Sequence, residues 1–367
     1  MKKSLVLFAL ATISLASCSS SGGTQGGSQA ASSDESAKAK QAFSALRLAS
    51  EEGLKSDSFG MVLSKGKVNA AFAAGEGEEK KEYGLRVEPC AFDLRMAGLN
   101  ATSFNDLKLS LLGKTSSAKQ GSRAYLSGDE LFTGAIAKDG LPLTADAYLQ
   151  DSVFYLNLYD MAVLRRGVNE IIKSEIDPDF EGFPARGHYA FSAEQIEEAE
   201  KELPLGTSLR EAPQKIEEEL LSAYASSSES FSFASDAQGG RITFSTTSWD
   251  SLETIVNAFD LPADIGKEDI DSLFADAKKD ATLTRCVFDF EYSASHWDAL
   301  SYDLCLTFKD GAGNDTFTPI GEWTAVGRLD FSYGEDAMPV SLSEKDITRY
   351  QSELAWPNFN ASEEAGE

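Results

Sequence analysis

The stretch that decides the fold is 282-TLTRCVFDFEYSASHWDALSYDLCLTF-308. In its first half, the even positions from Cys286 to Tyr292 are apolar or aromatic, whereas Arg285 and Glu291 lie on odd positions. Successive side chains of a β-strand point to opposite faces, so this alternation is typical of a strand with one buried face. The second half alternates in the same way. We therefore expect two antiparallel strands, at residues 282–292 and 300–308.

A third strand follows with the same pattern, 322-EWTAVGRLDFSY-333. Three consecutive strands with one apolar face predict a half-buried antiparallel sheet. Ala325 and Gly327 lie among the aromatic residues of this face, where small side chains permit strong curvature or leave unfilled volume. The sequence thus predicts a concave apolar wall. Two alternatives stay open: helices fill the concavity as an ordinary core, or a ligand occupies it.

The first half of the chain predicts a helix followed by further strands. A short amphipathic helix is expected over residues 37–53, with Phe43 and Leu46 on its apolar side and Gly53 at its end. The strands are expected at 66–74, 82–87, 90–96, 107–112, 122–126, 131–137 and, after a tight turn at Asp139–Gly140, 145–159.

Helical spacing then replaces the alternation. Apolar positions predict a helix over residues 161–176 that Asp177–Pro178 ends. A helical segment follows at about 192–224, in which Ser192 and Gln195 form a capping box and Pro213 opens a second helix.

Strand and helix signals alternate before the three clear strands. Residues 231–246 predict a strand interrupted by Gly239–Gly240. Apolar residues at helical spacing predict two helices, at residues 252–259 and 270–277.

The first residues predict export and lipidation. Lys2 and Lys3 precede an apolar stretch over residues 5–15 that is too short to span a bilayer unaided. The stretch ends in 15-LASC-18, which resembles the bacterial lipobox, where the Cys carries diacylglycerol and acyl chains such as palmitate. The expected organisation is a lipoprotein signal peptide at 1–17, lipidated Cys18 with a Ser/Gly-rich tether at 18–36, a single domain at 37–355 and an acidic tail at 356–367.

The composition excludes several classes of partner. Thirty-three Lys and Arg residues stand against 59 Asp and Glu, a formal charge of -26. This charge repels phosphate backbones and anionic headgroups, so nucleic-acid binding and capture of a membrane by basic residues are excluded. With only His188 and His296, a multi-histidine metal site has little support. We expect attachment to a membrane through the lipid anchor alone.

Familiar catalytic and metal-binding motifs are absent, among them G-x-S-x-G, H-E-x-x-H and C-x-x-C. Asp289 and Glu291 lie on the polar face of their strand, where we expect them to be solvated rather than catalytic. Acidic residues at positions 177, 179 and 181 follow a helix as in a calcium loop, but the twelfth position is His188 instead of a bidentate Glu. No enzyme activity, cofactor or metal is therefore expected.

Three cysteines remain beside Cys18, and an exported context permits disulfide bonds. Cys286 and Cys305 fall on opposite faces of neighbouring strands, so they should not bond to each other. Cys90 lies in the apolar phase of its strand and is the only partner for Cys286 with a matching face. Buried free thiols are the alternative that we favour.

The layout resembles a known family. A lipobox, a Ser/Gly tether, an N-terminal helix and a long antiparallel sheet with helices are combined with the segments 147-AYLQDSVFYLNLYD-160 and 333-YGEDAMPV-340. Together they resemble the LolA/LppX-like bacterial lipoproteins over most of residues 38–342. The resemblance implies an α+β fold, a curved antiparallel β-sheet (half-barrel) with helices covering its concave face, where several such proteins carry acyl chains or lipids.

The expected function is that of an envelope lipoprotein that binds an apolar or lipid ligand without catalysis. Burial of apolar surface would supply the binding energy. The residues expected to hold the ligand are Phe288, Phe290, Tyr302, Leu304, Trp323, Ala325, Gly327, Leu329 and Phe331. The alternative is a non-catalytic structural or interaction module with a filled core, and a hydrolase built on unrecognised carboxylates is a third, weaker hypothesis.

Overall fold

The computed structural model describes the greater part of the chain. The described residues are 33–74, 81–99, 107–113, 123–127, 141–142, 145–158, 187–192, 205–236, 238–258, 267–309 and 317–350, with the single positions 169, 173, 179, 181 and 182. The predictions for residues 1–32, 131–137, 139–140, 193–204 and 351–367 lie outside them. Most of the expected helix at 161–176 and of the calcium-like loop also lies outside.

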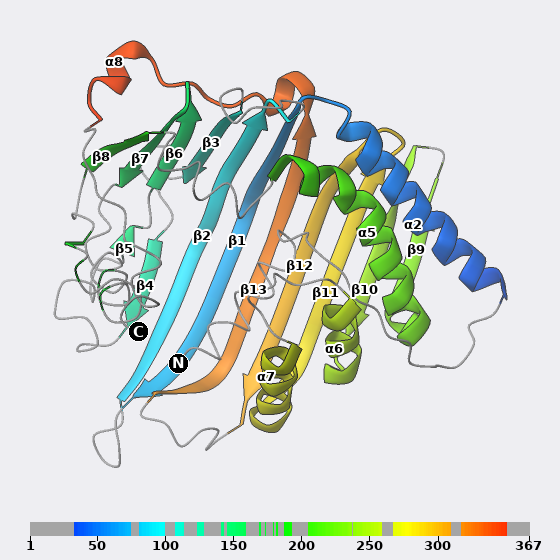
Figure 1. Ribbon diagram of the computed structural model, residues 1–367. Coiled ribbons are helices and arrows are strands. Elements are labelled where there is room, and N and C mark those ends of the chain that lie inside the picture. The colour runs from blue at the N-terminus through cyan, green and yellow to red at the C-terminus, as the bar shows by residue number, and fades with distance from the viewer. Residues whose placement is uncertain are drawn as a thin grey trace, which may run out of the picture.

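The described residues form one open, curved, antiparallel sheet of 13 strands (Figure 1). Its strands run in the order β8-β7-β6-β3-β2-β1-β13-β12-β11-β10-β9, and β4 pairs with β2 and with β5. The bounds are β1 Ser58–Ala74, β2 Lys81–Ala97, β3 Lys108–Gly113, β4 Arg123–Ser127, β5 Leu141–Pro142, β6 Ala145–Gln150, β7 Val153–Leu158, β8 Gly187–Ser192, β9 Phe231–Ser235, β10 Gly239–Thr246, β11 Ala281–Ser293, β12 Trp297–Phe308 and β13 Phe317–Tyr333.

Four helices lie in front of one face of the sheet, over the half that β9 to β13 form (Figure 1). They are α2 Ser33–Gly53, α5 Leu205–Ser226, α6 Trp249–Ala258 and α7 Lys267–Asp280. A short helix, α8 Glu344–Ile347, belongs to the segment that follows β13, and the 3-10 turns η3 Ser228–Ser230 and η4 Gly334–Ala337 precede β9 and follow β13. The coarse prediction of an α+β fold with a curved antiparallel sheet is therefore confirmed.

The three decisive strands are confirmed as β11, β12 and β13, which pair in sequence order. The N-terminal helix is also confirmed, since Phe43 and Leu46 of α2 are buried. It ends at Gly53, where a Cβ atom would lie 2.7 Å from the Tyr333 ring. The expected helices at 252–259 and 270–277 correspond to α6 and α7.

The prediction of a single strand over residues 145–159 is wrong, because these residues form two strands, β6 and β7, that pair as a hairpin. The turn residues Asp151 and Ser152 have φ angles of 52° and 62°. Positive φ at both central positions is typical of a type I′ hairpin turn, which Asn-Gly or Asp-Gly usually forms. The turn contains no glycine, so the sequence lacked the ordinary signal for a break.

Boundaries differ elsewhere in the sheet. The strands expected at 82–87 and 90–96 form one continuous strand, β2, whose register with β1 shifts around Gly66. The break in 231–246 falls at the turn before Gly239, where the Asp236 carboxylate accepts hydrogen bonds from the backbone N–H groups of Gln238 and Gly239. The glycines belong to β10 itself.

One helix-start prediction is wrong, because Pro213 lies inside α5, which begins at Leu205. Ser192 ends strand β8, and the helix expected after it lies outside the described residues. A proline inside a helix removes one backbone hydrogen bond, but the amphipathic turns after it bury Leu220 and Ala223 against the core. Packing of that face outweighs the local cost.

Candidate functional site

The residues expected to form an apolar wall lie side by side in rows across the sheet. Phe290 is opposite Leu300, Leu300 is opposite Leu329, and Leu329 is opposite Leu63 of β1. The neighbouring rows are Phe288, Tyr302 and Gly327, and Cys286, Leu304 and Ala325. Side chains of directly opposed residues share a face, so the predicted apolar face of β11 to β13 is confirmed and extends into β1.

Helices bury one part of this face completely. Phe43 of α2 is 0% exposed, and its ring makes edge contacts with the rings of Tyr224, Phe231 and Phe233. One hydrophobic cluster joins these aromatic residues to Leu220, Leu252 and Phe274 of the other helices and to the expected wall residues Phe290, Leu304, Trp323, Ala325 and Leu329. This part is an ordinary close-packed core.

Other apolar side chains on the same strands are only partly buried. They pack against the core cluster but are not fully buried by it. We call them the half-covered patch, which consists of Met61, Phe92, Phe288, Tyr302 and Phe331. Met61 and Phe331 are directly opposed across β1 and β13, and Phe288 and Tyr302 across β11 and β12. Three of the nine expected wall residues therefore remain accessible.

Of the two alternatives for Gly327, strong curvature or unfilled volume, the structure excludes unfilled volume. A Cβ atom built on Gly327 would lie 2.5 Å from the Tyr302 hydroxyl and 2.6 Å from Cζ of its ring. The ring of the opposed tyrosine thus covers the glycine. The same arrangement recurs at Gly240, where a Cβ atom would meet the Tyr292 ring at 2.5 Å. Aromatic side chains that cover cross-strand glycines are a known stabilising device in sheets.

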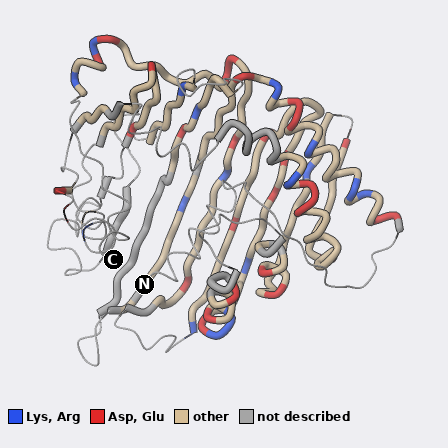
Figure 2. The backbone as a smooth tube through the Cα atoms, in the orientation of Figure 1, with Lys and Arg blue, Asp and Glu red and all other residues tan. Residues whose placement is uncertain are grey.

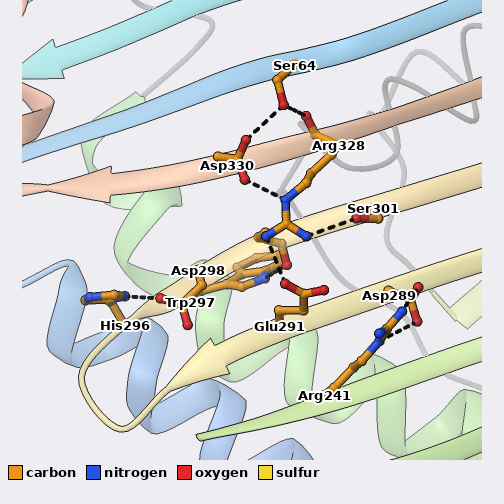
Figure 3. Close-up of polar contacts among 11 residues, drawn as sticks. Ser64, Arg241, Asp289, Glu291, His296, Trp297, Asp298, Ser301, Arg328 and Asp330 are labelled. Carbon is orange, nitrogen blue, oxygen red and sulfur yellow. Dashed lines mark hydrogen bonds and ion pairs between the residues drawn. The ribbon is translucent and has the colours of Figure 1, made fainter.

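Charged residues are distributed along the same strands (Figure 2), and the close-up shows their side chains on the face away from the helices (Figure 3). The Arg328 Nε donates a hydrogen bond to Asp330 at 2.7 Å, and its Nη2 pairs with Glu291 at 2.8 Å. The Ser64 hydroxyl donates to Asp330 at 2.9 Å. These contacts connect β1, β13 and β11, and they raise the pKa of the Arg328 guanidinium. Asp330 and Glu291 are thus both ion-paired with the same arginine.

Asp289 is buried and ion-paired, so the expectation of a solvated carboxylate is wrong. The residue is 8% exposed. Its carboxylate accepts hydrogen bonds from Arg241 (Figure 3) and from the Thr243 hydroxyl. Burial raises the pKa of Asp289, but the bonds from Arg241 and Thr243 outweigh it and leave the pKa below its ordinary value. Asp289 and Glu291 each have an arginine partner and do not form an acid–base pair.

Replacing Asp289 with asparagine is expected to lower the free energy of unfolding by about 1 kcal/mol at neutral pH. A carboxylate with a depressed folded-state pKa stabilises the fold above its unfolded pKa of about 3.9, and this contribution is lost as pH falls through the folded pKa. The difference between wild type and Asp289→Asn should therefore shrink below about pH 4. Urea unfolding at several pH values measures it, and a difference independent of pH would contradict the ion pair.

A Ser, His and Asp cluster that the sequence analysis did not single out lies at the β11–β12 hairpin. The Ser293 hydroxyl lies 3.2 Å from His296 Nδ1, and an Asp298 carboxylate oxygen lies 2.6 Å from the same nitrogen. A catalytic triad places the serine and the acid on different ring nitrogens. Here both contact Nδ1, and the imidazole stacks on Tyr333. The contacts connect the two sides of the hairpin turn and do not have the geometry of a triad.

The cysteine predictions can be tested at two positions. Cys286 and Cys305 are both free and buried, and burial raises the pKa of the Cys286 thiol to about 12. Cys90 lies on β2, and β1, β13 and β12 separate it from Cys286 on β11. Four strand spacings amount to about 19 Å, well beyond the reach of a disulfide bond. The face-matched pair is thus excluded, and free thiols are confirmed for Cys286 and Cys305.

Within the residues that the structure describes, no group of three or more His, Cys, Asp or Glu side chains is arranged to hold a metal ion. In the same part of the chain, no helix is long and apolar enough to cross a membrane. No protein-family model matches this chain, and neither does any curated protein.

Proposed function

We propose that this protein is a membrane-anchored lipoprotein whose half-barrel sheet holds an apolar or lipid ligand without catalysing a reaction. The observation that carries the proposal is the half-covered patch. Its members lie on the same face as the core, yet they stay partly exposed where Met61, Phe92 and Phe331 line β1, β2 and β13. Apolar patches that a fold leaves accessible commonly mark binding sites.

The proposal includes a half-barrel shape for the sheet. In a half-barrel, the helices α2, α5, α6 and α7 would cover part of the concave face, and the residues of the patch would stay partly accessible on the same face. A ligand first contacts Phe288, Tyr302 and Phe331. The remaining expected contacts are buried, and a ligand reaches them only if the surrounding side chains move: Phe290, Leu304, Trp323, Ala325, Gly327 and Leu329. Binding would gain about 25 cal/mol per Å² of apolar surface removed from water.

The location is proposed from the sequence. The lipobox supports export, removal of residues 1–17 and acylation of Cys18 with diacylglycerol and palmitate-like chains. Two or three acyl chains hold a protein stably at a bilayer. The protein would then sit on the extracytoplasmic side of a cell membrane, close to the lipids that the patch would bind.

A structural or interaction module with a filled core is the second candidate function. It is favoured by the close aromatic packing of α2 on β9 and by the Tyr302 ring that covers Gly327. On this hypothesis the half-covered patch is the solvent boundary of the core and no ligand binds.

A titration with a dansyl-labelled fatty acid distinguishes the two functions. The full chain carries Cys18→Ser so that the anchor does not interfere. Saturable binding is expected, and Phe331→Gln should weaken it about tenfold, because the ligand loses part of one aromatic contact. Val340→Gln is the matched control, since Val340 is 47% exposed, lies outside the patch and should leave binding unchanged.

Phe331 also contacts Trp297 and Phe59, so a second variant guards against misfolding. Phe288→Gln should weaken binding to a similar extent while the circular dichroism spectrum stays that of the wild type. Absence of saturable binding by the wild-type patch would favour the interaction module.

A further inference from the structure

Strand β9 forms one outer edge of the sheet (Figure 1). Residues Phe231–Ser235 pair with β10 on one side, and within the described part of the chain no strand pairs with the other side. An edge strand presents a row of backbone N–H and C=O groups that a further strand can use.

The register shows which groups point outward. The Asp236 N–H donates to the Gly239 carbonyl at 3.0 Å, so these two residues form a hydrogen-bonded pair of the antiparallel ladder. Such pairs recur at every second residue, which makes Ala234–Arg241 and Ser232–Thr243 the next pairs. The backbone groups of Phe233 and Ser235 therefore face away from β10. The outward N–H of Phe231 is already donated to the Ser228 carbonyl in the turn before the strand.

This edge lacks three of the features that commonly protect an edge strand. The sequence FSFAS contains no charged residue and no proline, and its pairing with β10 continues without a bulge. Natural edges are commonly blocked by lysine, proline or a bulge. The strand is also held in place from one face, because the Phe43 ring of α2 packs on the Phe233 ring at 5.5 Å. A strand that is already ordered loses little entropy when it binds a partner.

Charge at both ends of β9 selects the kind of partner. Glu229 precedes the strand and Asp236 follows it, and both are exposed. Two copies of this chain paired antiparallel about Phe233 would bring Asp236 of one copy next to Ser230, and so close to Glu229, of the other. Like charges across a strand pair are destabilising, which disfavours self-association through this edge. A segment with basic residues at its ends meets the opposite charge.

We propose that the β9 edge binds an extended peptide segment of a partner protein, flanked by basic residues, as an additional strand of the sheet. Backbone hydrogen bonds to Phe233 and Ser235 supply the pairing, and Glu229 and Asp236 favour the basic flanks. The surface is separate from the half-covered patch and does not depend on lipid binding.

The test uses the full chain with Cys18→Ser and a synthetic heptapeptide of alternating lysine and valine as the probe. Hydrogen exchange is expected to slow at the Phe233 and Ser235 amides when the peptide is added. Ser235→Pro removes an outward N–H without touching the ladder to β10, so it should weaken binding at least tenfold. Ser235→Ala keeps the N–H and is the matched control, with binding within twofold of wild type.

Charge is tested separately. Glu229→Gln should weaken binding of the lysine peptide about threefold, and a peptide of alternating glutamate and valine should not bind. Equal binding by Ser235→Pro and wild type, or unchanged exchange at Phe233 and Ser235, would overturn the proposal. A concentration-dependent dimer that Ser235→Pro abolishes would also overturn it, because β9 would then pair with a second copy of the chain.

Discussion

Replacing Phe43 with alanine is expected to lower the free energy of unfolding by about 3–5 kcal/mol, the largest single effect that we anticipate. The side chain is 0% exposed and lies between α5 and β9, where it contacts the rings of Tyr224, Phe231 and Phe233. Its removal takes away a large apolar surface and three aromatic contacts and leaves a cavity between helix and sheet. Urea unfolding followed by tryptophan fluorescence measures the loss.

Leu48→Ala provides the control on the same helix. Leu48 is 55% exposed, so its truncation should cost less than about 0.5 kcal/mol. A Phe43→Ala loss as small as that of Leu48→Ala would show that α2 does not depend on this contact and would contradict the description of the core. If α2 detaches, the variant should also bind an environment-sensitive dye such as ANS more strongly than the wild type does.

Replacing Gly327 with alanine is expected to destabilise the fold by about 1–3 kcal/mol, although alanine usually improves a strand. The new Cβ atom would lie 2.5 Å from the Tyr302 hydroxyl, so the ring must move from its position over the backbone. The displaced ring would lose its packing on the core cluster.

A double-mutant cycle isolates this cause. In the Tyr302→Ala background there is no ring to displace, so Gly327→Ala should cost less than about 0.5 kcal/mol or should stabilise the fold. Equal costs of Gly327→Ala in both backgrounds would mean that backbone conformation, not the tyrosine, requires the glycine. Gly321 offers a contrast, because it has a positive φ of 64° and no atom within 4 Å of a built Cβ, so any cost there is conformational.

The sequence predicted the centre of the sheet well, because alternation is a local signal. Cys286, Phe288 and Phe290 share a face through the pleat alone, and the register then brings each opposite an apolar partner on β12. The helices α2, α6 and α7 were likewise predicted from apolar residues at helical spacing. These features need no knowledge of distant parts of the chain.

The errors have non-local or conformational causes. The turn at Asp151–Ser152 adopts positive φ without glycine, so a hairpin was taken for one strand. Asp289 is paired with Arg241, which lies 48 positions earlier in the sequence and on the neighbouring strand β10. At Gly327 the sequence left strong curvature and unfilled volume as alternatives, because only the cross-strand register shows that Tyr302 covers this residue. A local sequence pattern predicts which face of a strand a side chain lies on. It does not predict which side chain of a neighbouring strand will contact it.

The candidate site was predicted in part. Of the residues expected to hold a ligand, Phe288, Tyr302 and Phe331 are accessible, and Met61 and Phe92 were not among those expected. Both lie on strands that the sequence did predict, but their adjacency to β13 follows from the order β2-β1-β13, which joins distant segments of the chain. Leu63 of β1 lies opposite Leu329 of β13, so the apolar face continues beyond the three strands β11, β12 and β13.

The most direct test of ligand binding is native mass spectrometry of the full chain with Cys18→Ser, purified from a bacterial export host without detergent, followed by organic extraction. The proposal predicts a reproducible mass above that of the polypeptide, which extraction removes and recovers as a lipid, and a lower occupancy in Phe331→Gln than in Val340→Gln. A bare polypeptide mass, together with no uptake of added phospholipid or fatty acid, would contradict it and leave the structural or interaction module as the function of this fold.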